Sequence, residues 1–365
     1  MVDLYRDDDL LVRAACPFGS TVCFVTFDSY SDVGSLDRPA FGESFLRDRG
    51  FDAVHILSRR NNWYLHETSA KAFDAARNAV TGYRRVVTYG SSMGGYAAIR
   101  FGRQVGAGHA IAMSPQYSIN PDTPPFETRW RFDAEAIDFR HENRWDDCFV
   151  EAATIFYDPR DPDRHHVEMF KGKTRVIAVP VVNGGHPCTT MLAEIGLLQT
   201  ALPEIAAGTF DPAIFAQHLK AERRRSAHLY YNISNNIRRP RDRVRFARMA
   251  ADLRPQYLPF LDHLGALLVQ VGDLEEGKRI LDHALVLEPD RQITLYRLSE
   301  YYEAAGDLDR AIAIMDRLVV GYPHLRNLGP RLNELLDIGV ERLYERLFDD
   351  EPGPTAVLVG RGPSN

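Results

Sequence analysis

Short apolar runs alternate with helical patterns along the first two hundred residues of the chain. Runs of strand length occur at 10–16, 21–27, 53–57, 85–90, 109–113, 152–157 and 175–179. Helical or helix-forming stretches lie between or after them, at 41–49, at 66–80, from 93 onward and at 188–201. This alternation predicts an α/β fold with a doubly wound, mostly parallel sheet covered by helices on both faces.

Residues 115–150 interrupt this rhythm. Pro121-Asp-Thr-Pro-Pro125 cannot continue a helix or a strand, and aromatic residues are interleaved with arginines beyond it. The aromatic residues are Trp130, Phe132, Phe139 and Trp145, and the arginines are Arg129, Arg131, Arg140 and Arg144. Two interpretations fit: a surface segment whose rings pack downward, or a lid whose rings and guanidinium groups contact a polar, ring-shaped ligand.

The strand at 85–90 leads into Gly90-Ser91-Ser92-Met93-Gly94, and a helix-forming stretch follows. Strand, sharp turn and helix form the context in which a Gly-x-Ser-x-Gly motif presents a serine nucleophile, here Ser92. Glycine is expected at the flanking positions because it tolerates both crowding and a positive φ. The helix that starts at Met93 directs its free N–H groups at the site, so the Met93 N–H is a candidate oxyanion donor.

The candidate partners of Ser92 follow it along the chain. A serine nucleophile needs a base to take its proton, and the base needs a carboxylate to fix its tautomer. Carboxylates follow the strand at 152–157, and His186 follows the strand at 175–179 in Asn183-Gly-Gly-His186. The carboxyl ends of parallel strands share one edge of the sheet, which brings these groups together. With nucleophile, acid and histidine in this order, residues 10–205 resemble the α/β-hydrolase family of the serine esterase type.

The resemblance implies which carboxylate is the acid. The family places the acid after a strand, a small residue and two further residues, which is Asp161 here. Asp158 stands in the place of the small residue and is the alternative acid. Asp163 ranks third, because it fits the N-cap of a following helix. His165 and His166 are expected to be exposed on that helix.

The same resemblance places a second oxyanion donor in the loop after the strand at 21–27. That loop lacks the family's His-Gly start, so Ser29 and Tyr30 are candidates by position alone. After the next strand, Asn62 and Trp63 are candidate substrate-binding residues, with Trp63 as a stacking platform. A turn built around a buried tryptophan explains this stretch equally well.

From about residue 207 the pattern is helical throughout, and it repeats. Pro255, Pro289 and Pro323 are spaced by 34 residues, and so are Gly272 and Gly306. This is the length of the tetratricopeptide repeat, and residues 222–323 resemble that family. Small residues let the paired helices approach, and each repeat buries its face only against its neighbours. The expected role is scaffolding or self-association of the enzyme, or the binding of a protein partner.

The patterns together predict four parts of the chain. An α/β-hydrolase domain covers 1–205 with an insertion at 115–150, and a helical linker covers 206–225. Repeats and a capping helix cover 226–350, and a disordered tail covers 351–365.

Composition narrows the function classes. The chain has 365 residues, a net charge of −6 and a pI near 6.1, so nucleic acid is not an expected partner. The four cysteines have no metal or disulfide spacing, and neither a signal peptide nor a membrane span is recognised. We expect a cytoplasmic protein that needs no metal and no cofactor.

The sequence therefore predicts an ester hydrolase that acts through an acyl-enzyme on Ser92, with Asp161 and His186. A polar acyl ester, such as an acylated glycan, suits the aromatic residues and arginines expected around the site better than a long-chain lipid. Two alternatives stand beside this hypothesis. One is acyl transfer by the same triad, and the other is a non-catalytic interaction protein with a vestigial hydrolase domain.

Overall fold

The computed structural model describes residues 1–145 and 147–348, so the tail predicted at 351–365 lies outside the described residues. Contacts within the chain divide it into two units, Met1–Ile233 and Ser234–Asn365. Each unit has a hydrophobic core of its own.

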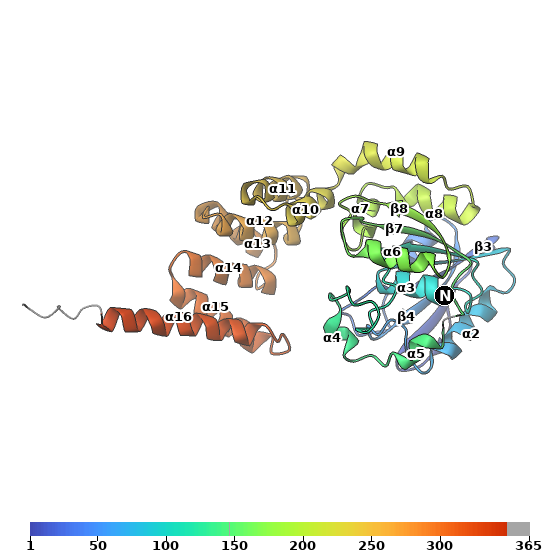
Figure 1. Ribbon diagram of the computed structural model, residues 1–365, viewed down its shortest axis with the longest axis horizontal. Coiled ribbons are helices and arrows are strands. Elements are labelled where there is room, and N and C mark those ends of the chain that lie inside the picture. Colours follow the sequence, from blue (N-terminus) through green and yellow to red (C-terminus); the bar gives the residue numbers. More distant parts are fainter. Residues whose placement is uncertain (146, 349–365) are drawn as a thin grey trace, which may run out of the picture. The chain divides into compact units, whose positions relative to one another are not determined.

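An eight-stranded sheet forms the centre of the first unit (Figure 1). Its strands are β1 (Val2–Arg6), β2 (Leu10–Ala15), β3 (Val22–Phe27), β4 (Asp52–Ser58), β5 (Arg85–Ser91), β6 (His109–Met113), β7 (Ala152–Tyr157) and β8 (Arg175–Pro180). They lie in the order β1-β2-β4-β3-β5-β6-β7-β8, in which β2 runs antiparallel to both neighbours and the other pairs are parallel. The predicted mostly parallel sheet is confirmed, and β1 is an additional edge strand.

Helices cover both faces of this sheet. One face carries α2 (Ser69–Val80), α3 (Met93–Arg100) and α6 (Asp163–Lys171), and the other carries α1 (Glu43–Arg47), α7 (Thr189–Glu194), α8 (Leu198–Ala207) and α9 (Pro212–Glu222). Side chains alternate between the two faces along the strands: in β3, Val25 and Phe27 belong to one core and Phe24 to the other. A sheet covered on both sides explains why its strands read as continuous apolar runs.

Two stretches differ from the expected elements. The helix predicted at 188–201 is broken into α7 and α8, because Gly196 between them adopts a φ of 79°. The segment at 115–150 is mostly irregular, with only the short helices α4 (Arg131–Ala134) and α5 (Arg140–Asn143) among its described residues.

The order of the strands creates a switch point between β3 and β5. β4 lies on one side of β3, whereas β5 and then β6 to β8 follow on its other side. Where the order reverses in this way, the carboxyl ends of two adjacent strands leave a crevice for a ligand. The loop with Ser29 and the turn with Ser92 both begin there.

Helices alone make up the described part of the second unit. They are the end of α10 (Ala227–Asn236), then α11 (Pro240–Leu253), α12 (Leu258–Gln270), α13 (Leu274–Leu287), α14 (Gln292–Ala304), α15 (Leu308–Gly321) and α16 (Leu328–Phe348). The pair α14 and α15 begins 34 residues after the pair α12 and α13. A Cβ at Gly265 would lie 2.6 Å from the side chain of Leu281. Small residues therefore set the close approach of paired helices, as tetratricopeptide packing requires.

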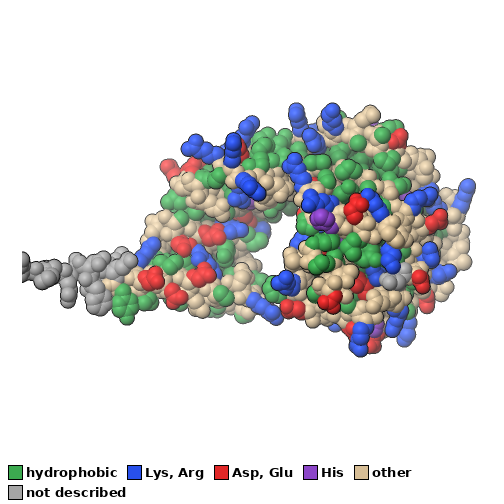
Figure 2. All heavy atoms as spheres, in the orientation of Figure 1, with side chains coloured by type: hydrophobic (Ala, Val, Ile, Leu, Met, Phe, Trp, Pro, Cys, Tyr) green, Lys and Arg blue, Asp and Glu red, His purple; other side chains and the backbone are tan. Residues whose placement is uncertain are grey.

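Charges of both signs are interspersed over the face shown in Figure 2. This distribution agrees with the mildly acidic composition, and it does not favour nucleic-acid binding on that face. No helix among the described residues is long and apolar enough to cross a membrane.

Candidate active site

Ser92 lies at the turn between β5 and α3 in a backbone conformation that few residues adopt. Its φ is 53° and its ψ is −117°, and its N–H donates to the Met113 carbonyl oxygen at 2.8 Å. A non-glycine residue in such a conformation costs roughly 1–3 kcal/mol, and such strain concentrates at functional sites. The turn thus holds Ser92 in a strained position at the carboxyl edge of the sheet.

The motif glycines are required for space. A Cβ at Gly90 would lie 2.1 Å from the Gly94 carbonyl oxygen, and a Cβ at Gly94 would lie 2.3 Å from the Phe27 carbonyl oxygen. Neither glycine has a positive φ; Ser92 carries it instead. The expectation that these glycines serve both purposes is therefore corrected, because crowding alone demands them.

Replacing Gly94 by alanine is expected to lower the free energy of unfolding by about 3 kcal/mol, because backbone atoms of β3 cannot yield to the added methyl group. Urea denaturation followed by circular dichroism measures the change. Gly82→Ala is the matched control, since a Cβ there would have no heavy atom within 4 Å. Equal stabilities for the two variants would contradict this account of the turn.

His186 connects Ser92 to a buried carboxylate. Ser92 Oγ lies 2.9 Å from His186 Nε2, and His186 Nδ1 lies 2.8 Å from Asp163 Oδ2. An ionised carboxylate only accepts hydrogen bonds, so Nδ1 carries the proton and Nε2 is free to accept one from Ser92. Burial by itself would raise the pKa of Asp163, but the hydrogen bond from His186 and the electrostatic attraction of Arg129 hold this pKa below its usual value.

The carboxylate beside His186 is Asp163, and neither Asp161 nor Asp158 takes this place. The Asp161 N–H donates to the Asp158 carbonyl oxygen at 3.1 Å, so a tight turn follows β7 where the family spacing assumes a short loop. Asp161 then binds Arg129, and Asp158 Oδ2 accepts the Gly185 N–H at 3.0 Å. Because of this turn, Asp163, the first residue of α6, lies next to His186.

Gln116 is a further polar contact of Ser92 and His186. Its Nε2 lies 3.1 Å from Ser92 Oγ and 3.2 Å from His186 Nε2, and its Oε1 accepts the Trp63 indole N–H at 3.2 Å. An indole can only donate, so Trp63 fixes which end of the amide faces Ser92. Trp63 is 1% exposed, so it serves as a buried support and not as the predicted stacking platform.

The candidate oxyanion donors lie on two sides of the switch point. Met93 begins α3, where the first N–H groups of a helix have no intrahelical acceptor. Ser29 and Tyr30 lie in the loop after β3, which Asn61 holds through two hydrogen bonds with the backbone of Ser31, at 3.0 and 2.9 Å. The loop is thus fixed without the glycines that the family uses.

Trp130, Trp63 and Tyr30 form an aromatic cluster next to His186, which we call the aromatic cover. The Trp130 ring lies 5.9 Å from the His186 ring, 5.5 Å from the Trp63 ring and 5.2 Å from the Tyr30 ring, centre to centre. Ser92, which contacts His186, is 4% exposed. The segment at 115–150 thus packs partly downward, with Trp145 in the core against Phe73, and it places Trp130 beside His186; contact with a ligand stays a prediction.

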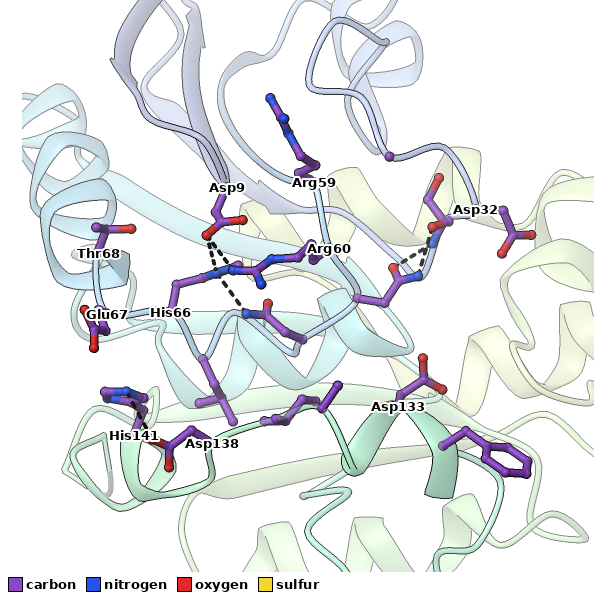
Figure 3. Close-up of a pocket in the computed structure, with 18 residues that line it drawn as sticks. Asp9, Asp32, Arg59, Arg60, His66, Glu67, Thr68, Asp133, Asp138 and His141 are labelled. Carbon is purple, nitrogen blue, oxygen red and sulfur yellow. Dashed lines mark hydrogen bonds and ion pairs between the residues drawn. The ribbon is translucent and has the colours of Figure 1, made fainter. Parts of the chain in front are cut away.

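A pocket of about 820 Å³ adjoins this aromatic cover (Figure 3). Asn62 and Asp133 both line this pocket. Asn62 precedes Trp63 in the chain, and Asp133 accepts a hydrogen bond from the Tyr30 hydroxyl at 3.2 Å. Figure 3 shows Asp9, Arg60 and His66 on one side and Asp133, Asp138 and His141 facing them. Ser92 is not among the residues that line the pocket, which approaches the site through Asn62 and through Asp133 beside Tyr30.

Asp161, Asp163 and His186 place one ligand atom each within 4.8 Å of one another, as metal ligands do. Here a side-chain cation already compensates the carboxylates: Arg129 lies 2.6 Å from Asp161 Oδ1 and 2.9 Å from Asp163 Oδ1. We therefore assign these residues to a hydrogen-bonded ion cluster.

Sequence reasoning missed Gln116 and Glu127 as neighbours of the site, and it placed neither Arg129 nor His166 in the hydrogen-bond network of Asp163 and Glu127. His166, expected to be exposed, is fully buried, and its Nε2 lies 2.9 Å from Glu127 Oε2. The only signal was the interleaving of charged and aromatic residues at 115–150. That pattern does not specify which side chain meets which.

Comparisons with known proteins give distant similarities only. No protein-family model matches the chain, and none of the curated proteins matches it. The capsule O-acetyltransferase of Neisseria meningitidis serogroup A has a similar structure with 12% identity, over 49% of this chain and 85% of that chain, at a TM-score of 0.36.

Two further solved structures are similar over part of the chain. The glycosylation-associated Gap123 complex from Streptococcus agalactiae matches with 13% identity, over 53% of this chain and 44% of that chain, at a TM-score of 0.40. A thermophilic TPR protein of Thermus thermophilus matches with 21% identity, over 37% of this chain and 77% of that chain, at a TM-score of 0.28. Similarity at this level does not establish a shared activity.

Proposed function

We propose that the chain is a serine-dependent ester hydrolase of the α/β-hydrolase fold that acts through an acyl-enzyme. The observation that carries the proposal is the continuous contact from Ser92 Oγ through both nitrogens of His186 to the buried Asp163. Nucleophile, base and acid stand in the geometry that acyl transfer needs, on loops at one edge of the sheet.

Each residue then has a role in the proposed reaction. His186 Nε2 takes the proton of Ser92 as Oγ bonds to the ester carbonyl carbon, and Asp163 holds the imidazole. The Met93 N–H, with an N–H of Ser29 or Tyr30, stabilises the oxyanion. The tetrahedral intermediate expels the alcohol, which takes its proton from His186. Water then repeats the attack and releases the acid.

The pocket beside the aromatic cover supports a polar substrate. Its lining offers hydroxyl-binding groups, namely the amides of Asn61 and Asn62 and the carboxylates of Asp32 and Asp133. Such groups suit an ester of a hydroxyl-rich molecule, for example an acylated glycan, better than a lipid tail. Asn62 is the substrate-binding residue that we propose here.

Acyl transfer is the second candidate, and the low exposure of Ser92 is the observation that favours it. The proposed nucleophile is 4% exposed, and Trp130 and Trp63 lie against its neighbours His186 and Gln116, so it is shielded from bulk water. A hydroxyl group bound in the neighbouring pocket would then compete well for the acyl group.

A fluorophosphonate probe followed by peptide mass spectrometry tests the catalytic proposal. We expect a single adduct on Ser92, because the base beside it raises the nucleophilicity of this serine above that of the others. Supplying acetylated sugars with and without a sugar acceptor then separates hydrolysis from transfer. The absence of an adduct at Ser92 would favour the non-catalytic alternative.

For the helical unit we propose protein binding or self-association. The support is a row of exposed apolar side chains at helical spacing on α16, namely Leu336, Val340, Leu343 and Tyr344. A contiguous apolar row of this kind is typical of an interaction surface. Sedimentation over a range of concentrations tests self-association.

A further inference from the structure

A charged network links the segment at 115–150 to the carboxylate beside His186. Arg129 Nη2 lies 2.9 Å from Asp163 Oδ1, the same carboxylate whose other oxygen lies nearer to His186 Nδ1. Arg129 Nη1 also binds Asp161 Oδ1 at 2.6 Å. One guanidinium group therefore spans two carboxylates of the β7–α6 connection.

A further carboxylate, Glu127, binds the Arg129 guanidinium group and fixes its orientation. Glu127 Oε2 lies 2.5 Å from Arg129 Nη2, and Glu127 Oε1 lies 3.0 Å from Arg129 Nε. His166 Nδ1 accepts the Tyr117 N–H at 3.0 Å, so His166 Nε2 carries the proton and donates to Glu127. Because Glu127 and His166 are buried, the guanidinium has little freedom to turn away.

We propose that Arg129 is a positioning residue that keeps Asp163 ionised and oriented toward His186, so that the triad is complete only while the segment at 115–150 is in place. This inference rests on the proposed function, since it assigns Arg129 a role in the same site.

The charges around Asp163 explain why one cation matters there. Burial and the neighbouring charge of Asp163 raise the pKa of Asp161 to about 6. Glu127 is a third carboxylate, and it too forms an ion pair with Arg129. The nearby Cys188 thiol adds no negative charge, because burial raises its pKa to about 12. Without Arg129, three carboxylates would face one another with no fixed side-chain cation between them in the described part of the chain.

Loss of Arg129 is therefore expected to change the pH dependence of activity in one direction. An uncompensated carboxylate cluster binds protons more readily, so the pKa of Asp163 rises and its carboxylate becomes protonated at a higher pH. A protonated Asp163 cannot hold the imidazolium that forms during acyl transfer. His186 must be unprotonated to accept the Ser92 proton, and removal of a nearby cation also favours its protonated form, so activity falls off at a higher pH on the acid side of the profile.

For Arg129→Gln we expect the acid limb of the kcat/KM profile for p-nitrophenyl acetate to move up by about 1–2 pH units. The matched control is Lys171→Gln, which removes an exposed cation of α6 that pairs with Glu168 at the surface. Its profile should coincide with that of the wild type. A uniform loss at every pH, with the limb unmoved, would overturn the inference.

Arg129→Lys keeps the test decisive if the glutamine variant does not fold. Lysine retains the charge but not the planar fork, so we expect the acid limb to stay within about half a unit and kcat/KM to fall about tenfold. A lysine variant as active as the wild type would overturn the positioning role. Fluorophosphonate labelling of the wild type separates failure of this inference from failure of the proposed function. Ser92 of an active hydrolase is labelled whether or not Arg129 positions Asp163, so labelling at Ser92 supports the function independently of the role of Arg129.

Discussion

Asp163→Asn is expected to lower kcat/KM by about 10⁴-fold while the fold is retained. Asp163 Oδ2 lies 2.8 Å from His186 Nδ1, so an asparagine there can present its amide N–H to the ring and select the wrong tautomer. His186 Nε2 would then carry a proton and could not accept the one on Ser92. Hydrolysis of p-nitrophenyl acetate, with circular dichroism as the check on folding, measures this effect.

Asp161→Asn provides the contrast, because the family spacing would make it the more damaging change. Asp161 binds Arg129 and its own turn, and no hydrogen bond joins it to His186 among the described residues. We expect kcat/KM to fall by less than about tenfold, as for loss of a partly buried ion pair that does not touch His186. A larger loss in Asp161→Asn than in Asp163→Asn would show that the acid is Asp161 after all.

The sheet could be predicted from the sequence because its strands are buried on both faces. Val25 and Phe27 face one core and Phe24 the other, so the whole run is apolar and easily recognised. β1 could not be found in this way, since its side chains are mostly exposed. Edge strands carry little periodic signal when neither face is buried.

The site could be predicted only as far as local chemistry determines it. Ser92 and His186 are predicted as neighbours because a strand, a turn and small residues mark their loops, and the structure brings the two side chains into contact. The choice among Asp158, Asp161 and Asp163 depends on how the backbone turns after β7, which spacing does not encode. The contacts of Arg129 depend on a segment with little regular structure.

The second large effect on activity is expected at Ser92. Two substitutions there separate the strain of the backbone from the chemistry of the side chain. Ser92→Ala is expected to abolish fluorophosphonate labelling and to lower kcat/KM by about 10⁴–10⁶-fold, because no nucleophile remains beside His186. Ser92→Gly should be equally inactive. Measurement of labelling and of p-nitrophenyl acetate hydrolysis in both variants checks this expectation.

The two variants should nevertheless differ in stability. Alanine keeps a Cβ at a φ of 53°, whereas glycine adopts that conformation without strain. We therefore expect Ser92→Gly to be about 1 kcal/mol more stable than Ser92→Ala in urea denaturation, since relief of the strain exceeds the entropic cost of glycine. Equal stability would mean that the turn does not store strain at Ser92, and retained labelling in either variant would place the nucleophile elsewhere. The paired outcome, lost activity with regained stability, is what a site that holds its nucleophile under strain requires.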